Sequence, residues 1–199
     1  MSISLERIES YIGLDDGMFL KEKSKWTVLA GVKFVGTSWI DVAFTKISVD
    51  GLDGTDSAER TVKRLMGNSE SAVIFLDGIT YAGFNIVDPD ELSARTDLIV
   101  VAVFMRRPNE ERILKALKLH FPDWEDRWKI IHRVSSKLSE INVRGRTIYF
   151  YSSPNKAGIS LLIRKNIVTS KVPEPLRIAD MLAKEIGKMF VRTGKGIST

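Results

Sequence analysis

Short apolar runs and longer amphipathic segments alternate along the chain and predict a mixed α/β protein. Strands are expected over Ile8–Leu14 and Trp26–Gly36, and a third over Trp39–Gly51, where apolar residues recur imperfectly at every second position. Because the turn between the second and third strands is short, these two strands are predicted to form an antiparallel hairpin.

Helical and wholly apolar segments alternate after the hairpin. A helix is expected next, because Asp56 and Glu59 have the spacing of an N-cap residue and its capping partner. Apolar strands are expected over Val73–Asp77 and Leu98–Met105, on either side of a short helix with Pro89 near its first position. The remaining elements are predicted as helices over 110–121, 124–133, 156–168 and 173–191, with a turn and a strand over 143–153.

The order of these elements predicts how the sheet is connected. A helical crossover joins parallel strands and is right-handed, so Val73–Asp77 is expected beside and parallel to Ile8–Leu14. The result is a mixed sheet of five or more strands in the order of about 3-2-1-4-5, flanked by helices, and this topology resembles the three-layer ribonuclease H-like fold. Residues 1–199 are expected to form a single domain, with a disordered tail after about residue 191.

Composition narrows the class of protein. A hydrophobic content of 44% over 199 residues is enough for a sizeable core. The absence of cysteine excludes a disulfide framework, thiolate zinc sites and cysteine nucleophiles. The longest apolar run is too short to span a bilayer, and the first ten residues lack the pattern of a signal peptide. We therefore expect a cytoplasmic protein with no membrane association.

Net charge and common motifs give a weaker indication of the partner. The formal net charge of +5 favours a polyanion, and nucleic acid (DNA or RNA) is the first candidate. The sequence has no GxxxxGK loop and no GxGxxG motif, and His120 and His132 are expected on helix surfaces. The chemistry of the protein must therefore come from other residues.

Aspartates provide the most informative pattern. Asp15 and Asp77 each follow an apolar strand, and parallel neighbours would bring them together at one edge of the sheet. Carboxylate oxygens suit Mg²⁺ or Mn²⁺, which could act on a phosphodiester. Asp50 or Asp53 could add a third ligand, although each precedes or lies near a glycine and could equally belong to a turn. Asp180 is a fourth candidate.

Alternatives remain open for two of these features. Asp180 has the helical spacing to pair with Arg177 or Lys184 instead of a metal ion. The loop after Asp77 carries aromatic and amide side chains around a glycine, which would allow a nucleobase to approach the backbone. The same loop could instead pack its aromatic residues under the edge of the sheet. The candidate substrate-binding residues of this loop are Tyr81, Gly83, Phe84 and Asn85.

Five motifs in this order resemble a known family. They are GLDDG, VDGLDGTD, FLDGITYAGFNIVD, HFPDWEDRW and VPEPLRIADMLA, and they extend from about Gly13 to Phe190. The family is the domain-of-unknown-function family 99, a largely archaeal group that is similar to endonuclease V. The resemblance implies a ribonuclease H-like fold, and the more distant relation to endonuclease V implies magnesium-dependent cleavage near deaminated purines in DNA or RNA.

Individual residues can be carried over from endonuclease V. Asp15 and Asp77 match its two strand-end aspartates, Asp50 or Asp53 would replace a glutamate, and Asp180 would correspond to a late ligand. The phosphate-contacting lysine after the fifth strand would be replaced by Arg106 or Arg107.

The chain also departs from the endonuclease V pattern in two places. The proline-tyrosine wedge is missing near 44–48, and Ile79-Thr80 follows Asp77-Gly78 where a second glycine would be expected. Both departures put inosine-specific cleavage in doubt.

Two hypotheses follow from these observations. The first is a hydrolase, a Mg²⁺- or Mn²⁺-dependent nuclease in which Asp15 and Asp77 bind the metal. The second is an inactive nucleic-acid-binding or protein-interaction domain that has kept the fold. Retention of both strand-end aspartates favours the enzyme, and the replaced third carboxylate favours the inactive domain. The sequence does not predict the oligomeric state.

Overall fold

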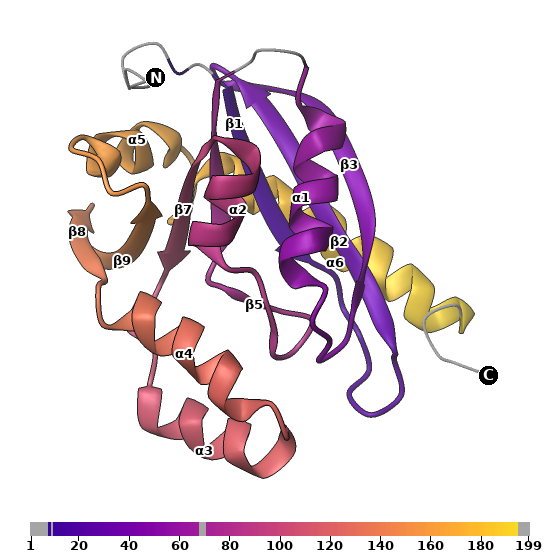
Figure 1. Ribbon diagram of the computed structural model, residues 1–199. Coiled ribbons are helices and arrows are strands. Elements are labelled where there is room, and N and C mark those ends of the chain that lie inside the picture. The colour runs from indigo at the N-terminus through magenta and orange to yellow at the C-terminus, as the bar shows by residue number, and fades with distance from the viewer. Residues whose placement is uncertain (1–7, 9, 68–70, 195–199) are drawn as a thin grey trace.

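The computed structural model describes residue 8, residues 10–67 and residues 71–194 (Figure 1). The first half of this part contains β1 (Ser10–Asp16), β2 (Trp26–Val35), β3 (Ser38–Ser48), α1 (Gly54–Leu65), β4 (Ala72–Asp77), β5 (Thr80–Tyr81) and β6 (Asn85–Ile86). The second half contains α2 (Pro89–Thr96), β7 (Ile99–Phe104), α3 (Glu110–His120), α4 (Trp124–Ser135), β8 (Ser139–Val143), β9 (Arg146–Ser153), α5 (Ile159–Asn166) and α6 (Glu174–Thr193).

Seven of the strands form one mixed sheet in the order β3-β2-β1-β4-β7-β9-β8. The strands β1, β4 and β7 run parallel to one another, whereas every other neighbouring pair is antiparallel. The predicted order 3-2-1-4-5 is therefore confirmed for the first five positions, and the β8–β9 hairpin extends the sheet beyond them. The parallel centre follows from the helical crossovers α1 and α2, since a hairpin turn cannot join parallel strands.

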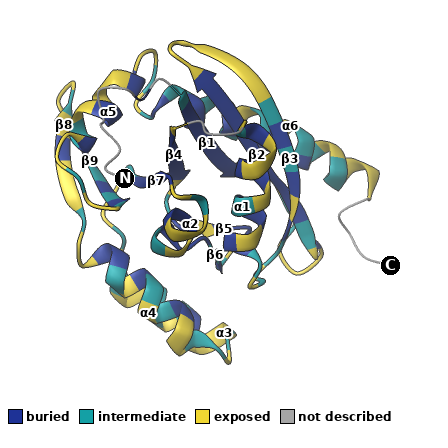
Figure 2. Cartoon of the chain, turned by 45° about the horizontal axis from the view of Figure 1, so that its top comes forward, coloured by how far each residue is buried: buried dark blue, intermediate teal, exposed yellow. Residues whose placement is uncertain are grey.

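Helices cover both faces of the sheet, which explains why its central strands are apolar throughout. Alternate residues of β4 enter different clusters: Ile74 packs with the helices α1, α2 and α4, and Val73 packs with α5 and α6. Figure 2 shows the central strands as buried, with the exposed residues on the outer sides of the helices and at the ends of the edge strands. The parallel strands β1, β4 and β7 end near the lower part of Figure 1, where α3 and α4 also lie.

Several local predictions need correction. Helix α1 begins at Gly54 with Asp53 in the N-cap position, so the capping role expected for Asp56 and Glu59 is wrong. Both side chains instead bind the guanidinium of Arg95 on α2, because they project from the first two turns towards that helix. The strands β5, β6 and β8 were not predicted, since they are short and contain few alternating apolar residues.

The two ends of the described chain also differ slightly from expectation. The first strand begins at Ser10 and continues to Asp16. Both aspartates of GLDDG therefore belong to the end of the strand and pair with β2. Helix α6 extends to Thr193 and is followed by Gly194 in a left-handed conformation. The tail predicted to be disordered lies outside the described residues beyond this glycine. None of the described helices combines the length and the apolar character needed to cross a membrane.

Candidate active site

The candidate site begins where the parallel strands β1 and β4 end side by side. Leu14 pairs with Leu76 in the sheet, so the next residues, Asp15 and Asp77, are neighbours as the sequence predicts. The hydroxyl of Tyr81 fixes both strand ends, because it donates to the carbonyl of Leu14 at 3.1 Å and accepts from the backbone N–H of Asp77 at 3.0 Å.

Helix α6 crosses β1 unusually closely and adds a third aspartate. A Cβ atom on Gly13 would lie 2.2 Å from the carbonyl carbon of Pro175, and one on Gly17 would lie 2.6 Å from the carbonyl oxygen of Ala183. Only glycine permits such contact between two backbones. Asp180 lies between these two contact points on the helix and is held over the end of β1.

These elements enclose a cavity of about 540 Å³ with mostly charged walls. Its lining residues are Asp15, Asp16, Gly17, Met18, Phe19, Asp77, Asp180, Lys184 and Lys188. The candidates Asp15, Asp77 and Asp180 are thus brought together from β1, β4 and α6. Asp16 joins them although it was not singled out from the sequence, where only its place in an Asp-Asp-Gly run could have indicated a role.

Burial and mutual repulsion strongly affect the protonation of this cluster. Asp15 is only 7% exposed, and burial, followed by the charges of Asp77 and Asp16, raises its pKa far above the usual range. Burial raises the pKa of Asp16 to about 6, although the backbone N–H of Ala82 donates to its carboxylate at 2.9 Å and opposes the shift. Asp77 is open to solvent on one side, but the protein around it and the charge of Asp180 also raise its pKa.

A lysine partly compensates the negative charge. The Nζ atom of Lys184 lies 2.5 Å from the Oδ1 atom of Asp180, which confirms the pairing at helical spacing that the sequence left open. Arg177 instead pairs with Glu174. The pair between Asp180 and Lys184 lies on the wall of the cavity rather than on an outer helix surface, so the ammonium group is the nearest resident counter-charge of the aspartates.

The donor set matches a hard divalent cation, but it is incomplete as a protein-only site. All of the candidate ligands are carboxylates, which Mg²⁺ and Mn²⁺ prefer. Burial first, and then repulsion from neighbouring aspartates, raises the pKa values of Asp15, Asp16 and Asp77, and a bound cation would offset both effects. Within the described part of the chain, no group of three or more histidine, cysteine, aspartate or glutamate side chains could hold a metal ion. Any ion would therefore need oxygen ligands from water or substrate.

The structure does not bring Asp50 and Asp53 to this cavity. The Asp53 carboxylate accepts from the backbone N–H of Ser48 at 3.2 Å and from the side-chain amide of Asn85 at 2.6 Å. Asp50 is exposed, and its Oδ1 atom accepts from the backbone N–H of Phe84 at 2.8 Å. Both aspartates thus organise loops, which is the turn role that the sequence could not distinguish from a ligand role.

The aromatic loop after Asp77 has two different parts. Tyr81 and Asn85 are buried, at 1% and 0% exposure, so their side chains serve the packing role considered as the alternative. Asn85 donates to the carbonyl of Ser48 at 2.8 Å in addition to its bond with Asp53. Gly83 and Phe84 instead reach a surface groove beside the loop. Of the four candidate substrate-binding residues, Gly83 and Phe84 are therefore the ones that a ligand could reach in this groove.

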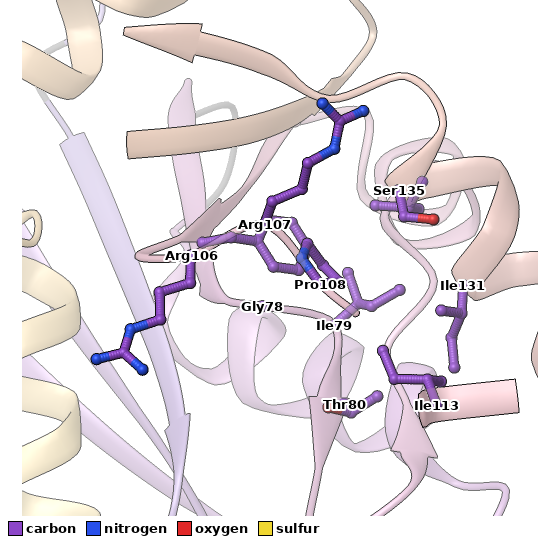
Figure 3. Close-up of a pocket in the computed structure, with 11 residues that line it drawn as sticks. Gly78, Ile79, Thr80, Arg106, Arg107, Pro108, Ile113, Ile131 and Ser135 are labelled. Atoms are coloured by element: carbon purple, nitrogen blue, oxygen red, sulfur yellow. The ribbon is translucent and has the colours of Figure 1, made fainter. Parts of the chain in front are cut away.

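A smaller cavity of about 280 Å³ adjoins the Asp77 strand end through Gly78 (Figure 3). Ile79, Ile113 and Ile131 form much of its apolar wall. Arg106 and Arg107 lie at its rim, both exposed, and Figure 3 shows their guanidinium groups pointing in different directions. Both arginines therefore lie beside the strand end, as the sequence predicts for residues that follow β7.

Comparisons with known proteins show the family of the chain. The family model described as endonuclease dU matches residues 8–187. A UPF0215 protein of Methanosarcina mazei is 40% identical over 182 residues, which cover 88% of this chain and 89% of the relative. A crystal structure of a protein of unknown function from Archaeoglobus fulgidus has a TM-score of 0.74 and 30% identity, with 87% of this chain and 95% of that chain covered.

The fold extends to more distant proteins. Endonuclease V of Ciona intestinalis, solved with DNA containing an inosine followed by a ribo-adenosine, has a TM-score of 0.61 at 13% identity. This match covers 94% of this chain and 88% of that chain, and it confirms the ribonuclease H-like architecture. The chain therefore belongs to the endonuclease dU family, the endonuclease V-like family that its sequence motifs resemble.

Proposed function

We propose that the protein is a metal-dependent endonuclease that cleaves the phosphodiester backbone of DNA or RNA next to a deaminated base. The observation that carries this proposal is the convergence of Asp15, Asp77 and Asp180 from two strand ends and one helix on a single cavity. The burial of Asp15 and the repulsion between it and its neighbouring aspartates are costly unless a cation or a proton neutralises the carboxylates. A structural role alone gives no reason to gather them.

Asp15 and Asp77 would hold the metal ion, with Asp16 or Asp180 close enough to the same cavity to contribute. Mg²⁺ is often bound by one or two carboxylates and completed by waters and substrate phosphates. This fits a cavity on which several aspartates converge although no three acidic, histidine or cysteine side chains of the described residues could hold an ion by themselves. A bound Mg²⁺ or Mn²⁺ would polarise the phosphodiester and lower the pKa of a bound water.

The residues of the chain would orient the nucleic acid around this site. The ammonium groups of Lys184 and Lys188 on the cavity wall suit phosphate oxygens, and Arg106 or Arg107 could contact a neighbouring phosphate from the rim of the smaller cavity. The apolar wall of that cavity, one residue beyond Asp77, is suited to a base turned out of its stack.

The comparisons support a deaminated base as the recognised feature. The family description names dU, and the Ciona intestinalis enzyme was solved with DNA that contains inosine. Uracil and hypoxanthine are the deamination products of cytosine and adenine, so both names refer to the same kind of lesion. Ile79-Thr80 follows Asp77-Gly78 where endonuclease V has a second glycine. The side chains of Ile79 and Thr80 would narrow the smaller cavity. We therefore place deoxyuridine first and deoxyinosine second.

The test is a cleavage assay with a matched set of substrates. Labelled single-stranded and duplex DNA with uracil, hypoxanthine or an ordinary base at one position, and RNA with hypoxanthine or an ordinary base there, are incubated in Mg²⁺, Mn²⁺ or EDTA. Cleavage is expected only with metal, and Asp15→Asn or Asp77→Asn should reduce it by about 10³-fold or more, as for loss of a main electrostatic contribution. Asp126→Asn removes an exposed aspartate on α4 and should have no effect.

One observation favours the second hypothesis, an inactive binding domain. The ion pair between Lys184 and Asp180 is what a site without metal would contain, and no three acidic, histidine or cysteine side chains of the described residues could hold a metal ion by themselves. Specific binding of the same nucleic acids without cleavage in any metal would support this hypothesis and refute the enzyme.

A further inference from the structure

A larger groove of about 990 Å³ lies beside the candidate active site and has no role in the proposed reaction. Phe19 borders both spaces, so the groove lies next to the carboxylate cavity. Its lining residues are Phe19, Lys21, Glu22, Lys23, Ser24, Lys25, Val49, Asp50, Gly83, Phe84, His120 and Phe121. They come from the β1–β2 loop, the end of β3, the aromatic loop after Asp77 and the end of α3.

The β1–β2 loop supplies a concentration of positive charge. Lys21, Lys23 and Lys25 are all exposed, and none of them forms an ion pair with another residue in the described parts of the chain. The loop has a defined conformation, because the Ser24 side chain accepts from the backbone N–H of Leu20 at 2.9 Å. The lysines are thus presented along one side of the groove.

Aromatic rings form another part of the groove lining. The rings of Phe84 and Phe121 lie 5.5 Å apart in an edge-to-face arrangement, and both are half-buried. The guanidinium of the buried Arg127 lies 4.4 Å from the ring of Phe121 and donates to the carbonyl of Phe84 at 2.5 Å. It also donates to the carbonyl of Asp50 at 3.0 Å, so one side chain holds the whole wall in place.

We infer that this groove binds an unpaired segment of nucleic acid that continues from the cleaved nucleotide. The lysines would contact its phosphates, and the rings of Phe19 and Phe84 would stack on its bases. Stacking requires an open base face, which a paired duplex does not offer, so the segment must be single-stranded. An acidic peptide would match the lysines, but its acidic side chains would not stack on the half-buried rings. The inference rests on the proposed function in one respect, because the bound segment is taken to continue from the nucleotide that the active site would cleave.

Binding can be measured without the nuclease reaction. A fluorescently labelled 12-nucleotide oligodeoxythymidine, which contains no deaminated base, is titrated with the protein in EDTA at several salt concentrations, and fluorescence anisotropy is recorded. The same measurement is made with a duplex of equal length. We expect the single strand to bind more tightly than the duplex.

Three variants separate the contributions. The triple variant Lys21→Gln, Lys23→Gln, Lys25→Gln should weaken binding at least about tenfold and reduce the slope of log K against log salt by about 2, at roughly 0.7 per phosphate contact. Phe84→Leu keeps the apolar volume but removes the ring, and it should weaken binding about tenfold without changing the slope. The triple variant Arg146→Gln, Arg164→Gln, Lys171→Gln removes equal charge from exposed positions away from the groove and should bind like the wild type.

The outcomes distinguish this inference from the proposed nuclease. Loss of binding in both groove variants supports the groove even if no cleavage is ever found. If the groove and control triple variants weakened oligonucleotide binding equally, binding would depend only on the net charge of the protein. That result would overturn the inference, even if the protein cleaves DNA. If the duplex bound as tightly as the single strand, the inference that the groove binds an unpaired segment would be wrong. Competition by polyglutamate as strong as by unlabelled oligonucleotide, with Phe84→Leu unchanged, would point to an acidic protein partner instead.

Folding controls keep these results interpretable. The three lysines are exposed, so their replacement should leave the thermal midpoint of unfolding within a few degrees of the wild type. Phe84 is partly packed against the core, so its variant is compared at a temperature well below its own midpoint.

Discussion

The ion pair between Lys184 and Asp180 is the contact in the carboxylate cavity that most directly affects its affinity for a metal ion. The ammonium lies 2.5 Å from the aspartate oxygen and is the positive charge closest to it, so a divalent cation must compete with it for Asp180. Asp15 and Asp77 also raise the pKa of Lys184, after the larger effect of its hydrogen bond to Asp180. The lysine therefore neutralises part of the cluster in the absence of metal.

Lys184→Gln should consequently tighten Mg²⁺ or Mn²⁺ binding, because it frees Asp180 and removes a repulsive charge. We expect the dissociation constant measured by isothermal titration calorimetry to fall about tenfold, which corresponds to about 1.4 kcal/mol. Lys63→Gln removes a lysine from a similar pair with Glu59 on α1 and serves as the control. An unchanged affinity for both metals would show that Asp180 is not a ligand.

At the residue scale, the sequence could identify only part of the site. Asp15 and Asp77 are predicted because each closes an apolar strand, and strand pairing then makes them neighbours. Asp53 has the same local pattern of carboxylate and glycine, yet it caps a turn through Ser48 and Asn85. The position of Asp180 depends on how α6 crosses the sheet, and helical spacing does not contain that information.

At the element scale, the packing of α6 on β1 determines whether the cavity exists. Gly13→Ala would place a methyl group 2.2 Å from the Pro175 backbone, which cannot move without the helix. We expect a loss of about 1–3 kcal/mol in the free energy of unfolding. We also expect a larger loss of cleavage and metal binding, because Asp180 would move away from Asp15. Urea unfolding and metal titration check the two effects separately.

A second glycine variant provides the comparison for Gly13→Ala. Gly36 has a φ of +60° at the tip of the β2–β3 hairpin, with nothing within 4 Å of an added Cβ. Gly36→Ala should therefore cost about 1 kcal/mol of backbone strain and leave the site intact. If the two variants lost equal stability and both retained metal binding, the close contact of α6 with β1 would not be what positions Asp180.

The order of the sheet was predictable because apolar runs and connection lengths restrict it to few topologies. The hairpin β5–β6 was not, since its strands contain two residues each and are held by Asn85 and Tyr81 rather than by a hydrophobic pattern. The start of α1 was misjudged for a related reason. Asp56 and Glu59 have capping spacing, but a tertiary contact with Arg95 on α2 uses both side chains.

At the scale of the whole molecule, negative charge gathers in the carboxylate cavity and positive charge gathers along the neighbouring groove. The chain has a net charge of +5, yet the cavity concentrates aspartates whose pKa values are raised, and the adjoining groove concentrates exposed lysines. A nucleic acid could bind the lysines through its phosphates and approach the aspartates only with a cation between them. Because burial, followed by repulsion between the aspartates, raises their pKa values, the stability of the metal-free protein should depend on pH.

The direction of that dependence follows from the raised pKa values of Asp15, Asp16 and Asp77. The folded protein holds protons that the unfolded chain has already released, so in EDTA the free energy of unfolding should fall as pH rises above about 4. For Asp16, the decrease in the free energy of unfolding extends through its pKa of about 6 and is about 2–3 kcal/mol. Glu174, whose pKa is lowered, acts oppositely and only below its usual value of 4.5.

Urea unfolding between pH 5 and 8 checks this dependence. The double variant Asp15→Asn, Asp16→Asn should be more stable than the wild type at pH 8 and should depend less on pH, because only the raised pKa of Asp77 remains. Mg²⁺ should stabilise the wild type more at pH 8 than at pH 5, because a cation binds the ionised carboxylates of the folded state alone. The double variant should not respond to Mg²⁺, whereas Asp126→Asn should follow the wild type. Stability that is flat with pH in EDTA, together with no effect of Mg²⁺, would mean that these aspartates are neither strained by their burial nor arranged for a metal ion.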